Sequence, residues 1–237
     1  MGISVVFLIF FLCQLSFSSS IFLCPKHQSI SLIKFKETFT TNPYASSKRY
    51  FRGQKPYPKT SSWNMSRDCC SLDGVICDDM TGHVIELDLG SSGLVGTIDS
   101  NSSLFQLSHL QRLDLSFNNF SNSHISPEFG KFSSLTHLDL SDSYFSGQIP
   151  SEISHLSKLH SLSLSGTGSL RLVAHDFKLL LQNLTQLREL DLDFINISST
   201  IPLNFSSHLT TLRLSGRGLY GVIPESIFHL PNWKHLT

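Results

Sequence analysis

From residue 84 onward, leucines and other large apolar residues recur with one internal spacing. Each segment reads L-x-x-L-x-L, with apolar residues at positions 1, 4 and 6 and mostly polar residues between them. Positions 4 and 6 alternate with solvent-facing ones, as in a β-strand that buries one face. Successive segments start 22 to 28 residues apart. Their first residues are Val84, Leu110, Leu135, Leu159, Leu187, Leu209 and Trp233.

One such strand cannot bury its leucines alone, so neighbouring segments must stack around a shared core. The pattern therefore predicts an α/β repeat solenoid over residues 83–237: a leucine-rich-repeat horseshoe with one long, curved parallel sheet. About six units are complete, and a seventh is cut before position 6. The fourth unit is the longest, and its extra residues near Arg171–Asp176 are expected to form a surface bulge. Asn118 stands at position 9, where an amide can satisfy backbone groups of the neighbouring turn.

The chain before the repeats has a different pattern. Residues 1–23 carry no charged side chain and combine an apolar run with small residues, which indicates a secretory signal peptide rather than a buried helix. No later segment offers the roughly 20 apolar residues of a membrane span. Residues 25–39 have helical spacing, and 40–62 read as a loop. We expect residues 24–82 to form a cap over the first repeat, which otherwise exposes its apolar face.

Four cysteines remain after the leader, and all of them precede the repeats. An even number in an exported chain favours disulfides, whereas a zinc site would call for CxxC spacing that is absent here. Pairing between the adjacent Cys69 and Cys70 would strain the backbone. Among the remaining pairings we expect Cys24–Cys69 and Cys70–Cys77.

The composition gives little reason to expect catalysis. Lys+Arg and Asp+Glu both total 18, so no global field favours nucleic acid or an acidic membrane. Eleven histidines occur, many at equivalent positions of successive units, which is typical of surface residues rather than of a metal or catalytic site. No G-x-S-x-G, HExxH or CxxC motif is present. We therefore expect a protein that is not an enzyme and holds no cofactor or metal.

The solvent-facing side of the curved sheet is the candidate binding face. Aspartate recurs there at position 5, which either solvates the strands or forms a mildly acidic groove for a ligand with basic groups. Phe117 and Phe194 are exposed aromatic residues of the kind that anchor interfaces, unless they fold back as packing. The candidate ligand-binding residues are Glu86, Asp88, Arg112, Asp114, Phe117, His137, Asp139, His160, Arg188, Asp191, Phe194 and Arg213.

Six N-x-[ST] sequons indicate a glycoprotein if the chain is exported. None falls at positions 2 to 8 of a repeat, so we expect the glycans to coat the back and flank of the solenoid and to leave the binding face bare. The sequons begin at Asn64, Asn101, Asn119, Asn183, Asn196 and Asn204.

Local motifs now point to a family. The segment Trp63–Cys77, the repeated Ile-Pro step and the glycine at position 13 resemble plant extracellular leucine-rich-repeat proteins. CPKHQS from Cys24, SSLFQLSHLQRLDLSFNNF from Ser102 and IPSEISHLSKL from Ile149 resemble the Cf-type resistance receptors of tomato. The resemblance implies an extracellular array that binds a protein or peptide ligand in defence, with a membrane span, a short tail and a separate co-receptor kinase. A secreted polygalacturonase-inhibitor type of protein and a receptor-kinase ectodomain are the alternatives.

The C-terminal end carries one further expectation. The seventh unit stops at Thr237 without a polar cap, a cysteine pair or a span. Solenoids need capping at both ends, so we expect the chain to be the N-terminal portion of a longer receptor, extracellular and held at the plasma membrane only through a missing C-terminal span.

Overall fold

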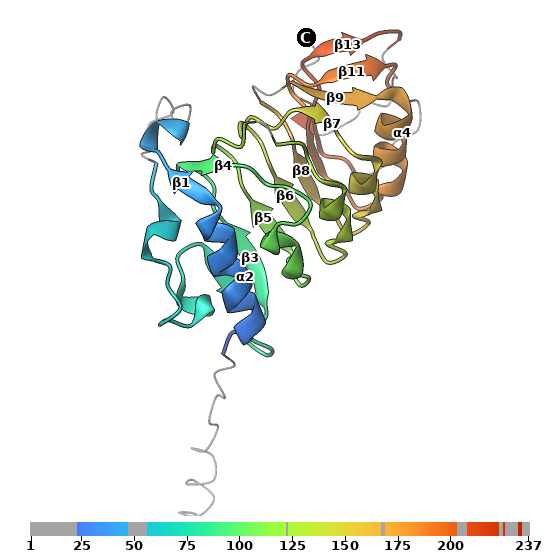
Figure 1. The fold of residues 1–237 in the computed structure, drawn as a ribbon. Coiled ribbons are helices and arrows are strands. Elements are labelled where there is room, and N and C mark those ends of the chain that lie inside the picture. The colour runs from blue at the N-terminus through green and yellow to red at the C-terminus, as the bar shows by residue number, and fades with distance from the viewer. Residues whose placement is uncertain are drawn as a thin grey trace, which may run out of the picture.

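Short strands one repeat apart align into an inner sheet. The computed structural model describes residues 23–46, 56–121, 123–166, 169–202, 208–222, 225 and 232–233. In these residues the sheet has the order β14-β12-β10-β8-β6-β5-β3-β2, parallel except for the antiparallel β2–β3 pair (Figure 1). Its strands are β2 (Val75–Cys77), β3 (Val84–Asp88), β5 (Arg112–Asp114), β6 (His137–Asp139), β8 (Ser161–Ser163), β10 (Glu189–Asp191), β12 (Thr211–Arg213) and β14 (Asn232–Trp233).

The register of this sheet explains the leucine spacing. One buried leucine from each of six successive strands is the direct partner of the next. These leucines are Leu87, Leu113, Leu138, Leu162, Leu190 and Leu212. Position 4 of the first six units therefore forms one apolar row, while positions 3 and 5 on either side point to the opposite face. The predicted repeat solenoid with a parallel sheet is confirmed.

A second set of strands follows the inner strands of the third to sixth turns. The strands β7, β9, β11 and β13 pair in parallel, and β1 and β4 form a separate antiparallel pair. Their bounds are β1 (Phe39–Thr41), β4 (Leu94–Gly96), β7 (Gly147–Gln148), β9 (Leu170–Val173), β11 (Asn196–Ser199) and β13 (Arg217–Leu219).

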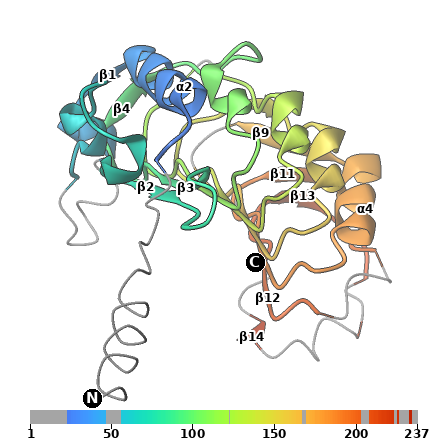
Figure 2. The same ribbon diagram turned by 90° about the horizontal axis from the view of Figure 1, so that it is seen from below.

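Helices line the outer side of the turns, away from the inner sheet (Figure 2). The α-helices are α2 (Lys26–Glu37) and α4 (Ala174–Asn183); the 3₁₀-helices are η1 (Pro43–Ser46), η2 (Lys59–Ser62), η3 (Cys69–Ser71), η4 (Ser103–Gln106), η5 (Pro127–Lys131) and η6 (Ser151–His155). The expected bulge at Arg171–Asp176 is wrong. These residues lie in β9 and the first turn of α4, because Leu170, Leu172 and Phe177 are apolar enough to join the core. The longer fourth unit thus replaces a 3₁₀ turn by an α-helix.

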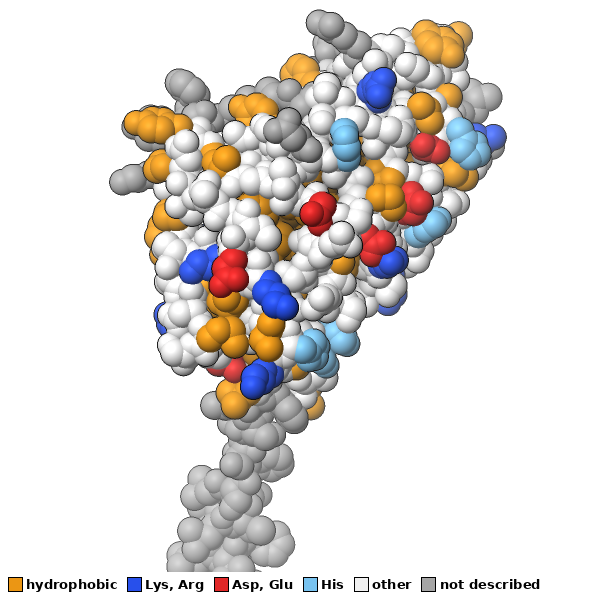
Figure 3. All heavy atoms as spheres, viewed as in Figure 1, with side chains coloured by type: hydrophobic (Ala, Val, Ile, Leu, Met, Phe, Trp, Pro, Cys, Tyr) orange, Lys and Arg blue, Asp and Glu red, His pale blue; other side chains and the backbone are white. Residues whose placement is uncertain are grey.

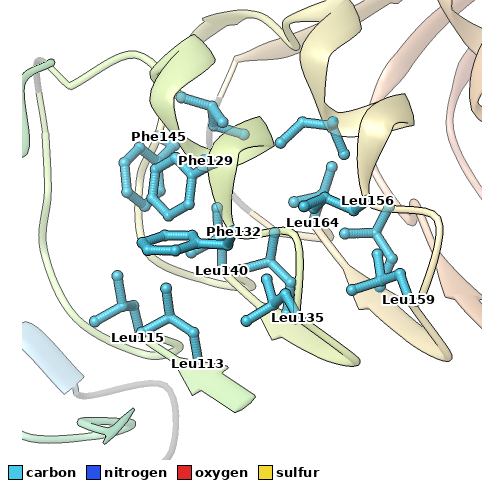
Figure 4. Packing of buried hydrophobic residues seen from close by; sticks show 14 of the residues in the cluster. Leu113, Leu115, Phe129, Phe132, Leu135, Leu140, Phe145, Leu156, Leu159 and Leu164 are labelled. Carbon is cyan, nitrogen blue, oxygen red and sulfur yellow. The ribbon is translucent and has the colours of Figure 1, made fainter. Parts of the chain in front are cut away.

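The core runs without interruption between the sheets and the helices. Figure 4 shows Leu113 of β5 and Leu140, the residue after β6, packed with Phe129 and Phe132 from the outer side. Full burial of each such side chain is worth about 1.5–3 kcal/mol. A line of phenylalanines also crosses the turns: the centroids of Phe35 and Phe39 are 4.9 Å apart, and Phe120 follows at 5.4 Å from Phe39. This line joins the N-terminal segment to the repeats.

Asn118 fulfils the role expected of position 9. It is fully buried, its Oδ1 accepts a hydrogen bond from the Leu94 amide at 2.9 Å, and its Nδ2 donates to the carbonyls of Leu89 and Leu115 at 2.9 and 3.0 Å. The amide therefore joins two successive turns. Ser143, one repeat later, donates to the Leu115 carbonyl at 2.6 Å, as a shorter substitute.

The segment before the repeats packs as a cap on the first turn. Its helix is within the predicted range, but the predicted loop 40–62 is partly wrong, because Thr40 and Thr41 continue β1 and pair with β4. Cys24 is bonded to Cys69 and Cys70 to Cys77, the pairs that the sequence analysis expects. The expected leader lies almost entirely outside the described residues. Among the described helices, none is long and apolar enough to cross a membrane.

Candidate ligand-binding face

The inner sheet brings most of the predicted binding residues into two rows. Glu86, Arg112 and His137 are partners on neighbouring strands at position 3. At position 5 the row runs through Asp88, Asp114, Asp139, Ser163, Asp191 and Arg213. His160 and Arg188 precede β8 and β10, and the ring of His160 lies 6.1 Å from that of His137. Burial, and next the charge of Arg112, lower the pKa of His137.

The repeated aspartate has a structural role that solvation alone does not explain. The Oδ1 atom of Asp114 accepts a hydrogen bond from the Ser116 amide, and Asp139 does the same with Ser141, each at 2.8 Å. Asp88 and Asp191 accept from the amides two residues ahead at 3.0 and 3.1 Å. One oxygen of each carboxylate thus fixes the turn that follows the strand. The other oxygen remains for partners outside the turn.

Those partners differ along the row. Lys59 from the cap lies 2.7 Å from Asp88, and Arg213 lies 3.4 Å from Asp191 and 3.5 Å from Asp193. Asp139 has no such cation among the described residues. Burial, followed by the neighbouring charge of Asp114, raises the pKa of Asp139 to about 6. Burial also raises the pKa of Asp191. Asp139 is therefore a partly buried carboxylate whose charge no described cation compensates.

An open hollow of about 1530 Å³ lies over β6, β8, β10 and β12. Five predicted residues line it: Phe117, Asp139, Asp191, Phe194 and Arg213. The hollow does not include seven others: Glu86, Asp88, Arg112, Asp114, His137, His160 and Arg188. It also takes in residues outside the candidate set, of which the charged and histidine members are His124, Asp142, Arg171 and Asp193. Asp142 and Asp193 stand at the solvent-facing positions 8 and 7 of the repeat, so their positions in the repeat pattern could have identified them. Arg171 belongs to the second sheet, which the L-x-x-L-x-L pattern does not reveal.

Phe117 and Phe194 occupy the same position of different repeats, and their surroundings differ. Both have left-handed backbone conformations, with φ of 54° and 67°. This conformation is unfavourable for a non-glycine residue. Ser91 and Asp142, at the same position of the first and third repeats, share this conformation, with φ of 56° and 51°. The Phe194 side chain is 72% exposed, whereas Phe117 is half-buried. Phe194 thus combines backbone strain with an exposed aromatic ring at the edge of the hollow.

The sequons only partly follow the expected distribution. Asn64, Asn101 and Asn183 are exposed, Asn119 is half-buried, and Asn204 lies outside the described residues. Asn196 is exposed on β11 and lines the hollow. The expectation that every sequon leaves the binding face bare is therefore wrong, because the second sheet turns back toward the inner sheet and forms one wall of the hollow.

Comparisons with known proteins agree with this architecture. Residues 25–78 match the family described as Leucine rich repeat N-terminal domain, and residues 109–132 and 134–156 match the Leucine Rich Repeat family. The chain is 60% identical over 231 residues to Receptor-like protein Cf-9 of Solanum pimpinellifolium. The chain belongs to the leucine-rich-repeat receptor-like proteins. This match covers 95% of the chain and 27% of the relative, so the chain spans about a quarter of the length of that receptor-like protein.

Solved ectodomains share the fold of this receptor-like chain. The BIR2 ectodomain from Arabidopsis thaliana is 26% identical with a TM-score of 0.57, over 81% of this chain and 93% of that one. The Arabidopsis receptor kinase HAESA ectodomain, solved with a peptide hormone ligand, is 26% identical with a TM-score of 0.58, over 85% of this chain and 35% of that one.

Proposed function

We propose that this chain is the N-terminal recognition module of an extracellular plant receptor-like protein, and that its hollow binds a protein or peptide ligand through a basic side chain. The observation that carries the proposal is the uncompensated, partly buried Asp139 in an open hollow. A cation placed beside it would regain the interaction that Lys59 gives Asp88. Charge-assisted hydrogen bonds of this kind are about twice as strong as neutral ones.

The hollow suits an extended segment better than a compact small molecule. It is open and spans several strands of the inner sheet, with serine hydroxyls on its floor at Ser141, Ser163 and Ser165. Phe194 offers an exposed aromatic surface for an apolar neighbour of the basic residue. The peptide bound in the HAESA structure provides a precedent in the same fold. Signalling through a separate kinase partner, and a role in defence, follow from the relation to receptor-like proteins and belong to this proposal.

Binding of peptides to the immobilised, secreted chain tests the proposal. A library of arginine- and lysine-containing peptides is compared with the same library after acetylation of lysines and replacement of arginine by citrulline. We expect the charged library alone to be retained. Among the retained peptides, Asp139→Asn should weaken binding by about tenfold, a loss of about 1.4 kcal/mol. Asp88→Asn, whose carboxylate is already paired, and Lys178→Ala on α4 are the matched controls. Equal retention of both libraries, or equal losses from Asp139→Asn and Asp88→Asn, would refute the proposal.

A further inference from the structure

Two histidine rings stack where the cap meets the first repeats. The imidazoles of His83, just before β3, and His109, just before β5, have centroids 3.9 Å apart and planes inclined by 8°. His27 on α2 is close enough to affect the charge of His83. None of these side chains lines the hollow, so they form a separate cluster at the junction of α2, β3 and the turn that leads into β5.

Gln28 of α2 fixes the protonation state of His83. The Gln28 side chain is fully buried, and its Oε1 accepts a hydrogen bond from the Val84 amide at 2.8 Å. Because a backbone amide can only donate, the Gln28 Nε2 must face the Nδ1 atom of His83, 3.1 Å away. That Nδ1 atom then accepts, which requires a neutral imidazole with its proton on Nε2.

Protonation of His83 would break this arrangement in either orientation of the amide. With Gln28 as it stands, a proton on Nδ1 would face the NH₂ group, so two donors would meet. If the amide flipped to accept from His83, its NH₂ would face the Val84 amide instead. One donor at this partly buried contact is left without a protein acceptor in both cases, which weakens the hydrogen bonds that join Gln28 to His83 and Val84.

The surroundings of His83 mostly disfavour its protonated form. Burial, then His109 and then His27, lower the pKa of His83. Protonation of His83 would place a cationic ring directly against the parallel ring of His109. Asp78 opposes these effects, but its Oδ1 already accepts hydrogen bonds from the Thr81 hydroxyl at 2.8 Å and the Met80 amide at 3.1 Å.

We propose that His83, held by Gln28 and stacked on His109, is an acid-sensitive latch between the cap helix and the first repeats. Neutral His83 keeps α2 joined to the start of β3; the imidazolium releases this contact and loosens the cap. The same helix reaches η4 through the Ser103 hydroxyl, which donates to the Ser31 carbonyl at 2.8 Å, and through the Ser31 hydroxyl beside Gln106 Oε1 at 2.8 Å. Release of α2 therefore affects the outer side of the first turn as well.

The lowered pKa of His83 sets how the stability of the latch depends on pH. The folded chain binds the proton of His83 more weakly than the unfolded chain, whose histidines titrate near pH ~6.5. The stabilisation is then complete above about pH 6.5 and is lost as the pH falls through the folded-state pKa. Asp139 has the opposite dependence, so a global melting curve would mix the two effects and an amide-resolved measurement is required.

Hydrogen exchange of the full, secreted chain tests the latch at the Val84 amide. After correction for intrinsic exchange, protection at Val84 should fall by up to about tenfold per pH unit below the ordinary histidine pKa, which corresponds to one proton taken up on opening. In His83→Asn, whose Oδ1 can still accept from Gln28, this dependence should disappear. It should persist in the matched control His155→Asn, an exposed histidine on η6. An unchanged pH dependence in His83→Asn, or none in the native chain, would overturn the proposal.

A second measurement does not require the His83 variant to fold. An NMR titration of the native chain should give His83 a pKa below the ordinary ~6.5. Substitution of the exposed partner, His109→Asn, should shift that pKa upward, because it removes one source of the shift. A His83 pKa at or above the ordinary value would also overturn the latch.

Discussion

Two adjacent regions of the inner sheet are built on the same repeat pattern but differ in charge balance. Around β3 and β5 two of the three acidic side chains meet cations of the same chain: Lys59 reaches Asp88, and Arg112 lies 3.4 Å from Glu86. Around β6 the sheet is hollowed, and Asp139 has no cation among the described residues. Figure 3 shows charged side chains scattered among polar ones rather than gathered in a block of one sign. A charged ligand would distinguish positions on such a surface by local differences in charge.

This difference shows why a repeated residue need not have a repeated function. Each position-5 aspartate holds the turn after its strand, and that role is common to both regions. The proposed binding of an external cation depends instead on whether the second oxygen already has a cation of the same chain beside it. The cap decides this at one end of the row, because Lys59 comes from η2 and not from a repeat.

The largest expected effect tests whether the two regions form one folding unit. Asn118→Ala would remove the acceptor of the Leu94 amide and the donor to Leu89 and Leu115, bonds that join the turns of β3 and β5 within the first region. We expect the free energy of unfolding to fall by about 2–4 kcal/mol. Ser143→Ala, at the same position one repeat later, should lose only about 1 kcal/mol. Denaturant unfolding measures both. Separate transitions for the two regions would contradict a shared core, and equal losses would contradict the larger role given to Asn118.

The second effect sharpens the contrast between paired and unpaired carboxylates. Because the folded-state pKa of Asp139 is raised to about 6, the folded chain binds its proton more tightly than the unfolded chain. Stability attributable to Asp139 should therefore rise as the pH falls from about 6 to about 4. Asp139→Asn keeps the acceptor for Ser141 and should gain about 1–2 kcal/mol at neutral pH. Asp88→Asn should instead lose less than about 1 kcal/mol. The contrast fails if the two variants respond alike across this pH range.

The third effect compares the two aromatic residues. Phe194→Gly should relieve the left-handed backbone conformation and stabilise the chain by about 1 kcal/mol, because its exposed ring contributes little packing. Phe117→Gly should show no gain, since loss of the half-buried ring offsets the same relief. Thermal unfolding of both variants decides this. A destabilised Phe194→Gly would mean that its ring packs against the protein, and would remove the case for Phe194 as a binding surface.

The smallest expected change in stability concerns the sequon in the hollow. Asn196→Gln should alter the free energy of unfolding by no more than about 0.5 kcal/mol. In secreted protein it should remove one glycan, seen as a loss of mass, and increase access of basic peptides to the hollow. Asn64→Gln on the cap should also lose a glycan but leave peptide binding unchanged. Identical masses for the native chain and Asn196→Gln would show that Asn196 carries no glycan.

Much of the fold was predictable because its signals are local and repeated. The spacing of Leu87, Leu113 and their equivalents predicts the strands, the parallel register and the buried row. Asn118 could be assigned for the same reason. The wrong bulge at Arg171–Asp176 and the missed strand at Thr40–Thr41 lie outside the repeated pattern, where pairing with distant strands decides the structure.

The sequence by itself determined the solenoid, the cap and the side of the sheet that faces solvent, because alternation and repeat length act over a few residues at a time. The tertiary structure alone decided which solvent-facing residues act together. Lys59 neutralises Asp88 across the cap, β9 and β11 add a wall to the hollow, and His83 meets Gln28 and His109 from separate elements. Burial and charge compensation depend on what lies nearby in space, and contacts between distant segments leave no periodic trace in the sequence.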